Sequence, residues 1–145
     1  MSTEATTQEL MFLGSRARIL MDGNATGGRL GLVDMIEVPA GQMPPVHVHC
    51  THQEGFYLVS GEVTLFLPGR EVKLTAGECF LAPSGIPHTY RVGTSPARWL
   101  ITSTPAGFER FVAAVAGLDE PDPAVLTAVA AEHDIEILGP PGELP

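Results

Sequence analysis

Histidine and glutamate residues with the spacing of metal ligands lie near the middle of the chain. His47 and His49 are two residues apart in the segment GQMPPVHVHCTHQEGFYLVSG. Alternate side chains of an extended strand point to the same face, so both imidazoles would face the same way. Glu54 follows five residues after His49, beyond a polar stretch that can form a turn. Two imidazoles and one carboxylate on one face suit a divalent transition metal, so these residues predict a metal site.

A fourth candidate ligand, His88, lies thirty-nine residues after His49. It ends the run GECFLAPSGIPH, in which Pro83, Gly85 and Pro87 precede it. Proline and glycine restrict and direct the backbone of tight turns, so this run predicts a stiff turn into a strand that begins near His88. A third imidazole would complete the ligand set that a first-row metal prefers.

The first of these segments resembles the first sequence motif of the cupin family. Gly41 is followed after five residues by His47, and His49 comes two positions later. Four residues separate His49 from Glu54, and six more separate Glu54 from Gly61. This spacing matches the motif at every fixed position.

The second segment resembles the second cupin motif. Gly77 is followed after five residues by Pro83, then by Gly85, and after two more residues by His88. The family motif usually ends with an asparagine four positions after the histidine, where this chain has Val92. That asparagine is not a metal ligand in the family, so the departure leaves the predicted ligands unaffected.

The resemblance covers residues 30 to 103 and implies fold, cofactor and ligands together. The implied fold is all-β: a cupin double-stranded β-helix, or jelly-roll barrel, here with two C-terminal α-helices. The implied cofactor is one divalent transition metal, Ni, Mn, Fe, Co or Zn, held by His47, His49, Glu54 and His88. The alternative is a metal-free barrel in which these side chains only hydrogen-bond to one another.

Composition and charge restrict the class of protein. The chain has 145 residues, 44% hydrophobic and 17% charged, which predicts one globular domain. Sixteen glycines and thirteen prolines punctuate many short segments and favour an all-β design. A net charge of −9 argues against binding a phosphate backbone, which requires clustered positive charge. A small-molecule substrate is therefore the expected partner, with no nucleic acid and no membrane.

Cysteine usage and hydropathy point to a cytoplasmic protein. Two cysteines, Cys50 and Cys79, do not make a disulfide framework. No apolar run reaches the ~18 residues of a membrane-spanning helix, and no signal-peptide pattern is visible at the N-terminus.

The chain divides into three predicted parts. Residues 1–9 are polar and predicted to be flexible, and residues 10–104 carry strand-like segments separated by turns every eight to twelve residues. Residues 105–145 are predicted to form a helical extension packed on the barrel. Within it, apolar residues recur at helical spacing over 107–118, and a second helix is expected over 123–133, with Asp122 as its cap and Pro123 at its first position.

Strand alternation extends the predicted site into a pocket. Phe56 and Leu58 share the parity of Glu54, and Tyr90 shares that of His88. If the ligands point inward, these three side chains line the same cavity; the alternative is ordinary barrel core. A buried Tyr90 hydroxyl would need a hydrogen-bond partner, which favours contact with a bound ligand.

Three further residues are weighed individually. Met43 is assigned to the pocket wall. His52 has the wrong parity to follow His49 on an ideal strand and is interpreted as a loop residue near the pocket mouth, or alternatively as a group that supports the metal ligands or the substrate. Cys50 points away from the face of His49 and is expected to be a packed thiol.

Two classes of enzyme, and one class without turnover, fit this site. The resemblance is to small cupins similar to quercetin dioxygenase, which implies oxygen-dependent attack on an enolic or aromatic, flavonoid- or polyketide-like molecule. The alternative is a non-redox, metal-dependent cyclase or isomerase, and the third possibility is a metal-dependent binding protein. In either enzyme Glu54 is the candidate base. A homodimer is expected, with the N-terminal strand or the terminal helices as contact surfaces.

Overall fold

Short strands with alternating apolar and polar residues make up most of the protein. The computed structural model describes residues 9–145. Its elements are, in order, β1 (Leu10–Phe12), β2 (Ser15–Met21), α1 (Gly23–Thr26), β3 (Gly31–Val38), β4 (His47–His49), β5 (Gln53–Ser60), β6 (Glu62–Leu67), β7 (Arg70–Thr75), β8 (Cys79–Ala82), β9 (Thr89–Val92), β10 (Ala97–Thr104), α2 (Phe108–Ala116), α3 (Pro123–Glu132) and β11 (Ile135–Ile137).

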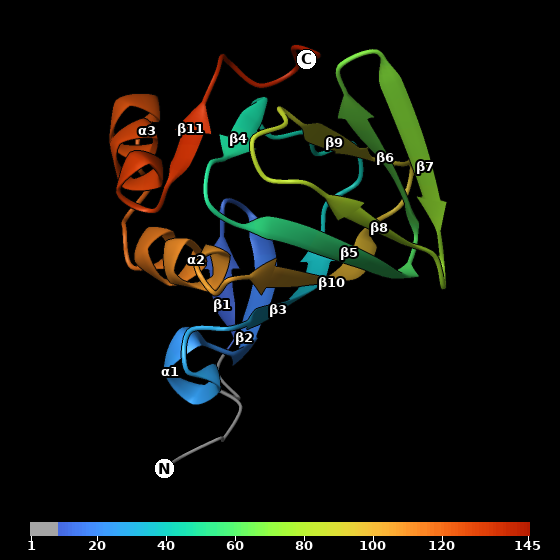
Figure 1. Ribbon diagram of the computed structural model, residues 1–145. Coiled ribbons are helices and arrows are strands. Elements are labelled where there is room, and N and C mark those ends of the chain that lie inside the picture. Colours follow the sequence, from blue (N-terminus) through green and yellow to red (C-terminus); the bar gives the residue numbers. More distant parts are fainter. Residues whose placement is uncertain (1–8) are drawn as a thin grey trace.

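The strands form two main sheets that face one another. The larger sheet has six strands in the order β1-β2-β3-β10-β5-β8, and the smaller has three in the order β7-β6-β9. A two-stranded ribbon of β4 and β11 lies beside them (Figure 1). Because strands adjacent in space come from distant parts of the chain, the topology is that of a jelly roll. The predicted all-β barrel with two C-terminal helices is confirmed.

The core fills the space between the two sheets. Alternation along β5 buries Glu54, Phe56 and Leu58, while Tyr57 and Val59 are exposed on the other side. The central neighbour of β5 is β10, which runs antiparallel to it and supplies the buried Trp99. The ligand strand β5 is therefore paired on both edges and held rigidly within the sheet.

The C-terminal extension packs beside β1 and β4. In α2, Phe108, Phe111, Val112 and Val115 are buried, as their helical spacing predicts. The Asp122 carboxylate caps α3 by accepting a hydrogen bond from the Val125 amide at 2.8 Å, and Pro123 stands in its first turn. The chain then returns as β11, an unpredicted strand that pairs antiparallel with β4 (Figure 1).

The glycine-containing run DGNATGG, residues 22–28, predicts a flexible turn, but the structure is more ordered there. They contain the short helix α1, capped by the Asp22 carboxylate, which accepts a hydrogen bond from the Ala25 amide at 2.9 Å. A buried carboxylate, Glu109 at the start of α2, accepts a hydrogen bond from the Gly23 amide at 2.9 Å and from the Gly107 amide at 2.6 Å. This long-range bridge orders a segment that local propensity leaves loose.

Replacing Glu109 with glutamine should lower the free energy of unfolding by about 1–3 kcal/mol. Both carboxylate oxygens accept a backbone hydrogen bond, whereas an amide offers only one acceptor and turns a donor toward the other N–H. Urea denaturation would measure the loss, with the exposed Glu71→Gln as control. A Glu109→Gln protein as stable as the control would contradict the bridging role.

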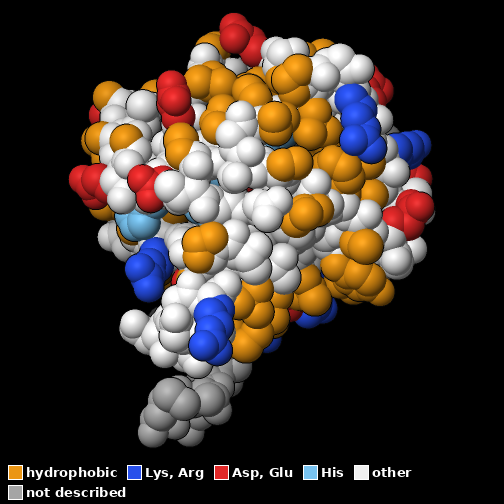
Figure 2. All heavy atoms as spheres, viewed as in Figure 1, with side chains coloured by type: hydrophobic (Ala, Val, Ile, Leu, Met, Phe, Trp, Pro, Cys, Tyr) orange, Lys and Arg blue, Asp and Glu red, His pale blue; other side chains and the backbone are white. Residues whose placement is uncertain are grey.

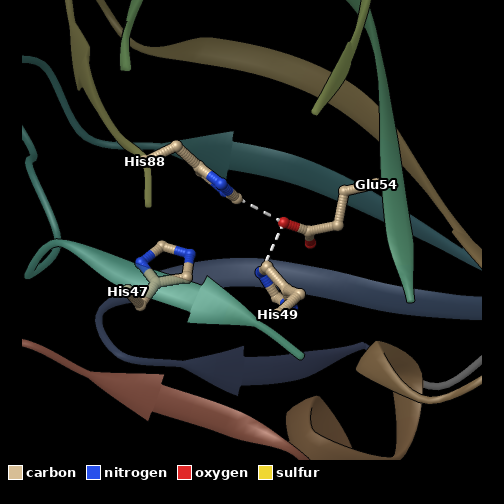
Figure 3. A group of neighbouring side chains, drawn as sticks. All are labelled: His47, His49, Glu54 and His88. Atoms are coloured by element: carbon tan, nitrogen blue, oxygen red, sulfur yellow. Dashed lines mark hydrogen bonds and ion pairs between the residues drawn. The ribbon is translucent and has the colours of Figure 1, made fainter. Parts of the chain in front are cut away.

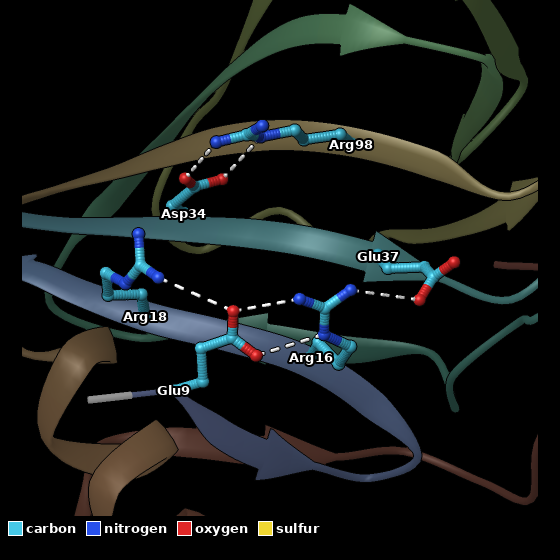
Figure 4. A network of polar contacts seen from close by, with 6 residues as sticks. All are labelled: Glu9, Arg16, Arg18, Asp34, Glu37 and Arg98. Carbon is cyan, nitrogen blue, oxygen red and sulfur yellow. Dashed lines mark hydrogen bonds and ion pairs between the residues drawn. The ribbon is translucent and has the colours of Figure 1, made fainter. Parts of the chain in front are cut away.

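The N-terminal edge carries a network of ion pairs. The Glu9 carboxylate lies 2.8 Å from Arg16 and 3.4 Å from Arg18, and Arg16 also reaches Glu37 at 3.3 Å (Figure 4). Apart from Glu9, the N-terminal residues 1–9, which are predicted to be flexible, lie outside the described residues. None of the helices within residues 9–145 has the length and apolar character needed to cross a bilayer.

Candidate metal centre

The two predicted ligand segments are joined by backbone hydrogen bonds. The His47 amide donates to the His88 carbonyl at 3.0 Å, and the His88 amide donates to the His47 carbonyl at 2.9 Å. This bridge brings β4 against the turn before β9, although His88 lies thirty-nine positions after His49 in the chain. Glu54 comes from β5, the next strand along the chain.

The side chains of His47, His49, Glu54 and His88 converge on one point. Each offers a ligand atom, and these atoms all lie within 4.8 Å of one another. The Glu54 Oε1 atom is 2.6 Å from His49 Nε2 and 3.2 Å from His88 Nε2 (Figure 3). Burial is nearly complete for His49, Glu54 and His88, each 2% exposed.

A hydrogen bond orients the His47 imidazole, and the His49 imidazole has a nitrogen without a hydrogen-bond partner among the described residues. His47 Nδ1 lies 2.8 Å from the Pro45 carbonyl, which can only accept, so Nδ1 carries the proton and Nε2 keeps its lone pair. The Nε2 atom of His49 is buried and, among the described residues, forms no bond with hydrogen-bond geometry, although Glu54 Oε1 lies only 2.6 Å away. An orphaned nitrogen beside a carboxylate oxygen is the arrangement expected of two ligands to one ion.

The electrostatics of the cluster favour a bound cation. Burial opposes the charge on the Glu54 carboxylate, but the adjacent imidazoles of His49 and His88 outweigh it and hold the pKa of Glu54 well below its ordinary value. Burial, reinforced by His88 and His49, lowers the pKa of His47 to about 3, so this imidazole is neutral at pH 7. A buried carboxylate beside a neutral imidazole lone pair needs positive charge, which a divalent ion supplies. The four side chains therefore fit one divalent transition metal, whose identity the ligands alone do not define.

His52 lies behind His49. It lies in the loop between β4 and β5, as its parity predicts, but it is 2% exposed rather than at a pocket mouth, and its Nε2 atom lies 2.7 Å from His49 Nδ1. Burial and the neighbouring His49 lower the pKa of His52 to about 4, so it is neutral at pH 7. A His49 side chain that binds a metal through Nε2 carries its proton on Nδ1, which then donates to His52 Nε2 and keeps the Nε2 lone pair of His49 toward the cluster. This arrangement matches the alternative interpretation, in which His52 supports a ligand.

Replacing His52 with alanine should weaken Zn²⁺ binding by about 10- to 100-fold, because His49 loses the acceptor that selects its tautomer. Competition titration against a chromogenic chelator would measure the affinity. His133→Ala is the matched control, since that imidazole bonds the Val129 carbonyl at 2.8 Å, away from the cluster. Equal Zn²⁺ affinity in both variants would contradict the orienting role of His52.

A small cavity adjoins the cluster. It measures about 80 Å³ and is lined by Phe56 and Tyr90, as strand parity predicts. Burial, and then the Glu54 charge, raise the pKa of Tyr90, so its hydroxyl stays protonated and can donate to an oxyanion. The other wall residues are mostly apolar and include Met35, Ile101, Phe108, Phe111, Leu126, Ile135 and Ile137.

Three residues predicted for the pocket do not line this cavity. Leu58 lies two positions beyond Phe56 on β5, where it is 1% exposed within the core between the sheets. His52 is separated from the cavity by His49. Met43 lines a second, outer cavity instead. Cys50 is exposed rather than packed, because β4 ends at His49 and the alternation of the strand does not continue beyond it.

The metal-free protein should lose stability as the pH falls below about 6.5. His47 and His52 have folded pKa values of about 3 and about 4, against 6.5 as the ordinary value. Between these limits the unfolded chain binds protons that the folded chain does not, so acid favours unfolding by up to about 1.4 kcal/mol per pH unit for each histidine. Urea denaturation between pH 7 and pH 4, in chelator, would measure the slope. A His47→Gln, His52→Gln double variant with the same slope would contradict this assignment.

Comparison with known proteins identifies the class. Residues 34–103 match the model of the cupin domain, so this chain carries a cupin domain, as its two motifs predict. The fold agrees with that of solved structures. KdgF from Halomonas sp. superposes with a TM-score of 0.65 and 18% identity over 76% of this chain and 99% of that chain.

Two proteins of Bacillus subtilis extend the comparison. An oxalate decarboxylase variant superposes with a TM-score of 0.62 and 19% identity, covering 99% of this chain and 44% of that chain, and so shares the fold. In sequence, quercetin 2,3-dioxygenase is 30% identical over 94 residues, which are 65% of this chain. That match spans only 28% of the dioxygenase, so the similarity is distant.

Proposed function

We propose that this protein is a metal-dependent dioxygenase that acts on a small enolic or aromatic molecule. The observation that carries the proposal is the convergence of His47, His49, Glu54 and His88 on one buried point beside an apolar cavity. The distant similarity to quercetin 2,3-dioxygenase supports the reaction class. When bound, a redox-capable metal would supply activation of the enol and of dioxygen.

The residues of the chain would divide the remaining work. The Glu54 carboxylate, which two imidazoles hold in place, would accept the proton of the substrate hydroxyl. Tyr90, which keeps its proton, would donate a hydrogen bond to the resulting enolate. Phe56, Ile101 and Phe108 would exclude water from the reacting atoms.

Metal analysis combined with oxygen uptake tests this proposal. Protein purified without chelator would be analysed for its metal, then reconstituted separately with Mn, Fe, Co, Ni and Zn and supplied with quercetin or simpler enols. Substrate-dependent oxygen uptake with a redox-capable metal, absent with Zn, is the expected result. Turnover with Zn and without oxygen uptake would instead indicate a cyclase or isomerase. Metal binding without turnover of any enol would indicate a binding protein.

We also propose that the protein forms a homodimer. The outer face of β5 and β8 carries the exposed apolar side chains Tyr57, Val59 and Leu81, 46%, 40% and 52% exposed. On the face shown in Figure 2 hydrophobic side chains occupy the centre, while most charged side chains lie near the edge. Apolar surface of this kind is typical of protein contacts. Light scattering coupled to size exclusion would report the mass, and a Leu81→Glu variant should be monomeric if β8 forms the contact.

A further inference from the structure

The inner cavity is too small to enclose a large substrate. Its volume is about 80 Å³, well below the ~300–1,000 Å³ typical of pockets that hold drug-sized ligands. A molecule with more than a few non-hydrogen atoms would bring its reactive end to the metal ligands and extend beyond this space. The part of the substrate that extends beyond the inner cavity needs a second binding site.

An outer chamber of about 730 Å³ lies directly next to the inner cavity. Six residues line both spaces, so the two adjoin: Leu13, Gln42, Pro44, Pro45, Leu126 and Ile137. The outer wall comes from the start of α3, including Pro123 and Thr127, and from the tail that follows β11, Leu138 to Pro141. This tail is fixed to the ligand strand region, because the Leu138 amide donates to the Val46 carbonyl at 2.9 Å.

The chemistry of the outer chamber is apolar and uncharged. None of its lining side chains is Asp, Glu, Lys, Arg or His, although the chain has a net charge of −9. Only Gln42 and Thr127 offer polar side-chain groups, and prolines make up much of the rest. Leu138 is 46% exposed, so a large apolar side chain remains available to a ligand. Such a surface favours an apolar ring system over a charged group.

We propose that the outer chamber binds the apolar body of an elongated substrate whose enolic end enters the inner cavity. The inference rests on the proposed function, because the metal-binding end of the substrate is taken from it. The substrate class is then a planar, uncharged, ring-containing enol, such as a flavonol, rather than a small hydroxy acid. Most of the side chains that would contact the body of the molecule belong to the C-terminal segment, and Leu13 and residues 42–45 supply the rest.

Binding to Zn²⁺-loaded protein tests the chamber, because Zn²⁺ does not support oxygen chemistry. Maltol and flavonol present the same hydroxy-pyranone group, and flavonol adds two benzene rings. Leu138→Glu places a carboxylate in the chamber. Leu118→Glu is the matched control, since Leu118 is 38% exposed and does not line either cavity.

The wild-type protein and Leu118→Glu should bind flavonol at least tenfold more tightly than maltol in isothermal titration. Leu138→Glu should lose that tenfold advantage while its affinity for maltol stays unchanged. Equal flavonol affinity in the two variants, or an equal loss for both compounds in Leu138→Glu, would overturn the proposal.

If the proposed function were wrong, the binding experiments would give a different set of results from those expected if only the outer-chamber proposal were wrong. Flavone has the same rings as flavonol without the enolic hydroxyl, so its binding reports on the outer chamber alone. If Zn²⁺-loaded protein did not bind maltol, the enol chemistry would be excluded. Flavone binding that is weakened by Leu138→Glu but not by Leu118→Glu would still support the chamber, and its absence would overturn it.

Discussion

Replacing His49 with alanine is expected to abolish metal binding, with an affinity loss of at least about 100-fold. His49 is the most constrained member of the cluster, since Nε2 lies 2.6 Å from Glu54 Oε1 and Nδ1 lies 2.7 Å from His52 Nε2. The substitution removes one metal ligand, and it also removes the imidazole that His52 orients. A bound ion stabilises only the folded state, by about 4 kcal/mol when its concentration is 1,000-fold above the Kd. The wild-type protein should therefore melt at a markedly higher temperature with metal than in chelator.

The informative quantity is the metal-induced shift in Tm rather than the Tm itself. Truncating a side chain that is 2% exposed also leaves a void, which destabilises the protein whether or not a metal is present. His49→Ala should show a lower Tm in chelator and no increase when Zn²⁺ is added. His133→Ala should respond to Zn²⁺ as the wild type does. A His49→Ala protein that retained stoichiometric metal and the full shift would refute the ligand assignment.

Replacing Glu54 with glutamine should reduce turnover by about 100- to 10,000-fold, the range expected when a positioned general base is removed. The amide keeps the size of the side chain and one oxygen able to bind a metal, so metal content should fall less than in His49→Ala. It cannot accept the substrate proton at neutral pH, and it brings a donor against the imidazoles that now contact Oε1.

Oxygen uptake by metal-loaded Glu54→Gln, normalised to metal content, would separate the two effects. Glu62→Gln is a suitable control, because Glu62 is an exposed residue on the strand β6, which forms part of the other sheet. Substrate affinity should change little if the residue acts on the proton alone. Wild-type turnover in Glu54→Gln would eliminate Glu54 as the base, whatever its place in the metal site.

Most of the C-terminal extension could be predicted from local sequence patterns, but its last strand, β11, could not. The start of α3 was predictable because Asp122 can cap a helix that has Pro123 in its first turn, and both act within one turn of the chain. The strand β11 was not, because three residues, Ile135 to Ile137, carry too weak a periodic signal. They become a strand only because β4 offers an unpaired edge.

The separate parts of the ligand cluster could be predicted from the sequence because each part is local. Alternation along a strand places His47 and His49 on one side of β4, and the turn before His88 is marked by proline and glycine. The same alternation correctly placed Phe56 on the cavity wall. Side-chain direction within one strand depends only on the backbone of that strand, so the sequence determined the common face of His47 and His49 and the all-β class. That Glu54 and His88 join them followed from the resemblance to the two cupin motifs, and the bridge between His47 and His88 is a contact of the tertiary structure.

Contacts between distant segments were decided only by the tertiary structure. His52 reaches His49 because the chain turns sharply after β4, against the parity of an extended strand. Phe108, Leu126 and Ile137 close the cavity from the C-terminal extension, and their apolar character alone could not distinguish a cavity wall from ordinary core. The size of the inner cavity and the presence of the outer chamber depend on how α3 and β11 pack against β4, which is set by the balance of many long-range contacts rather than by any local pattern.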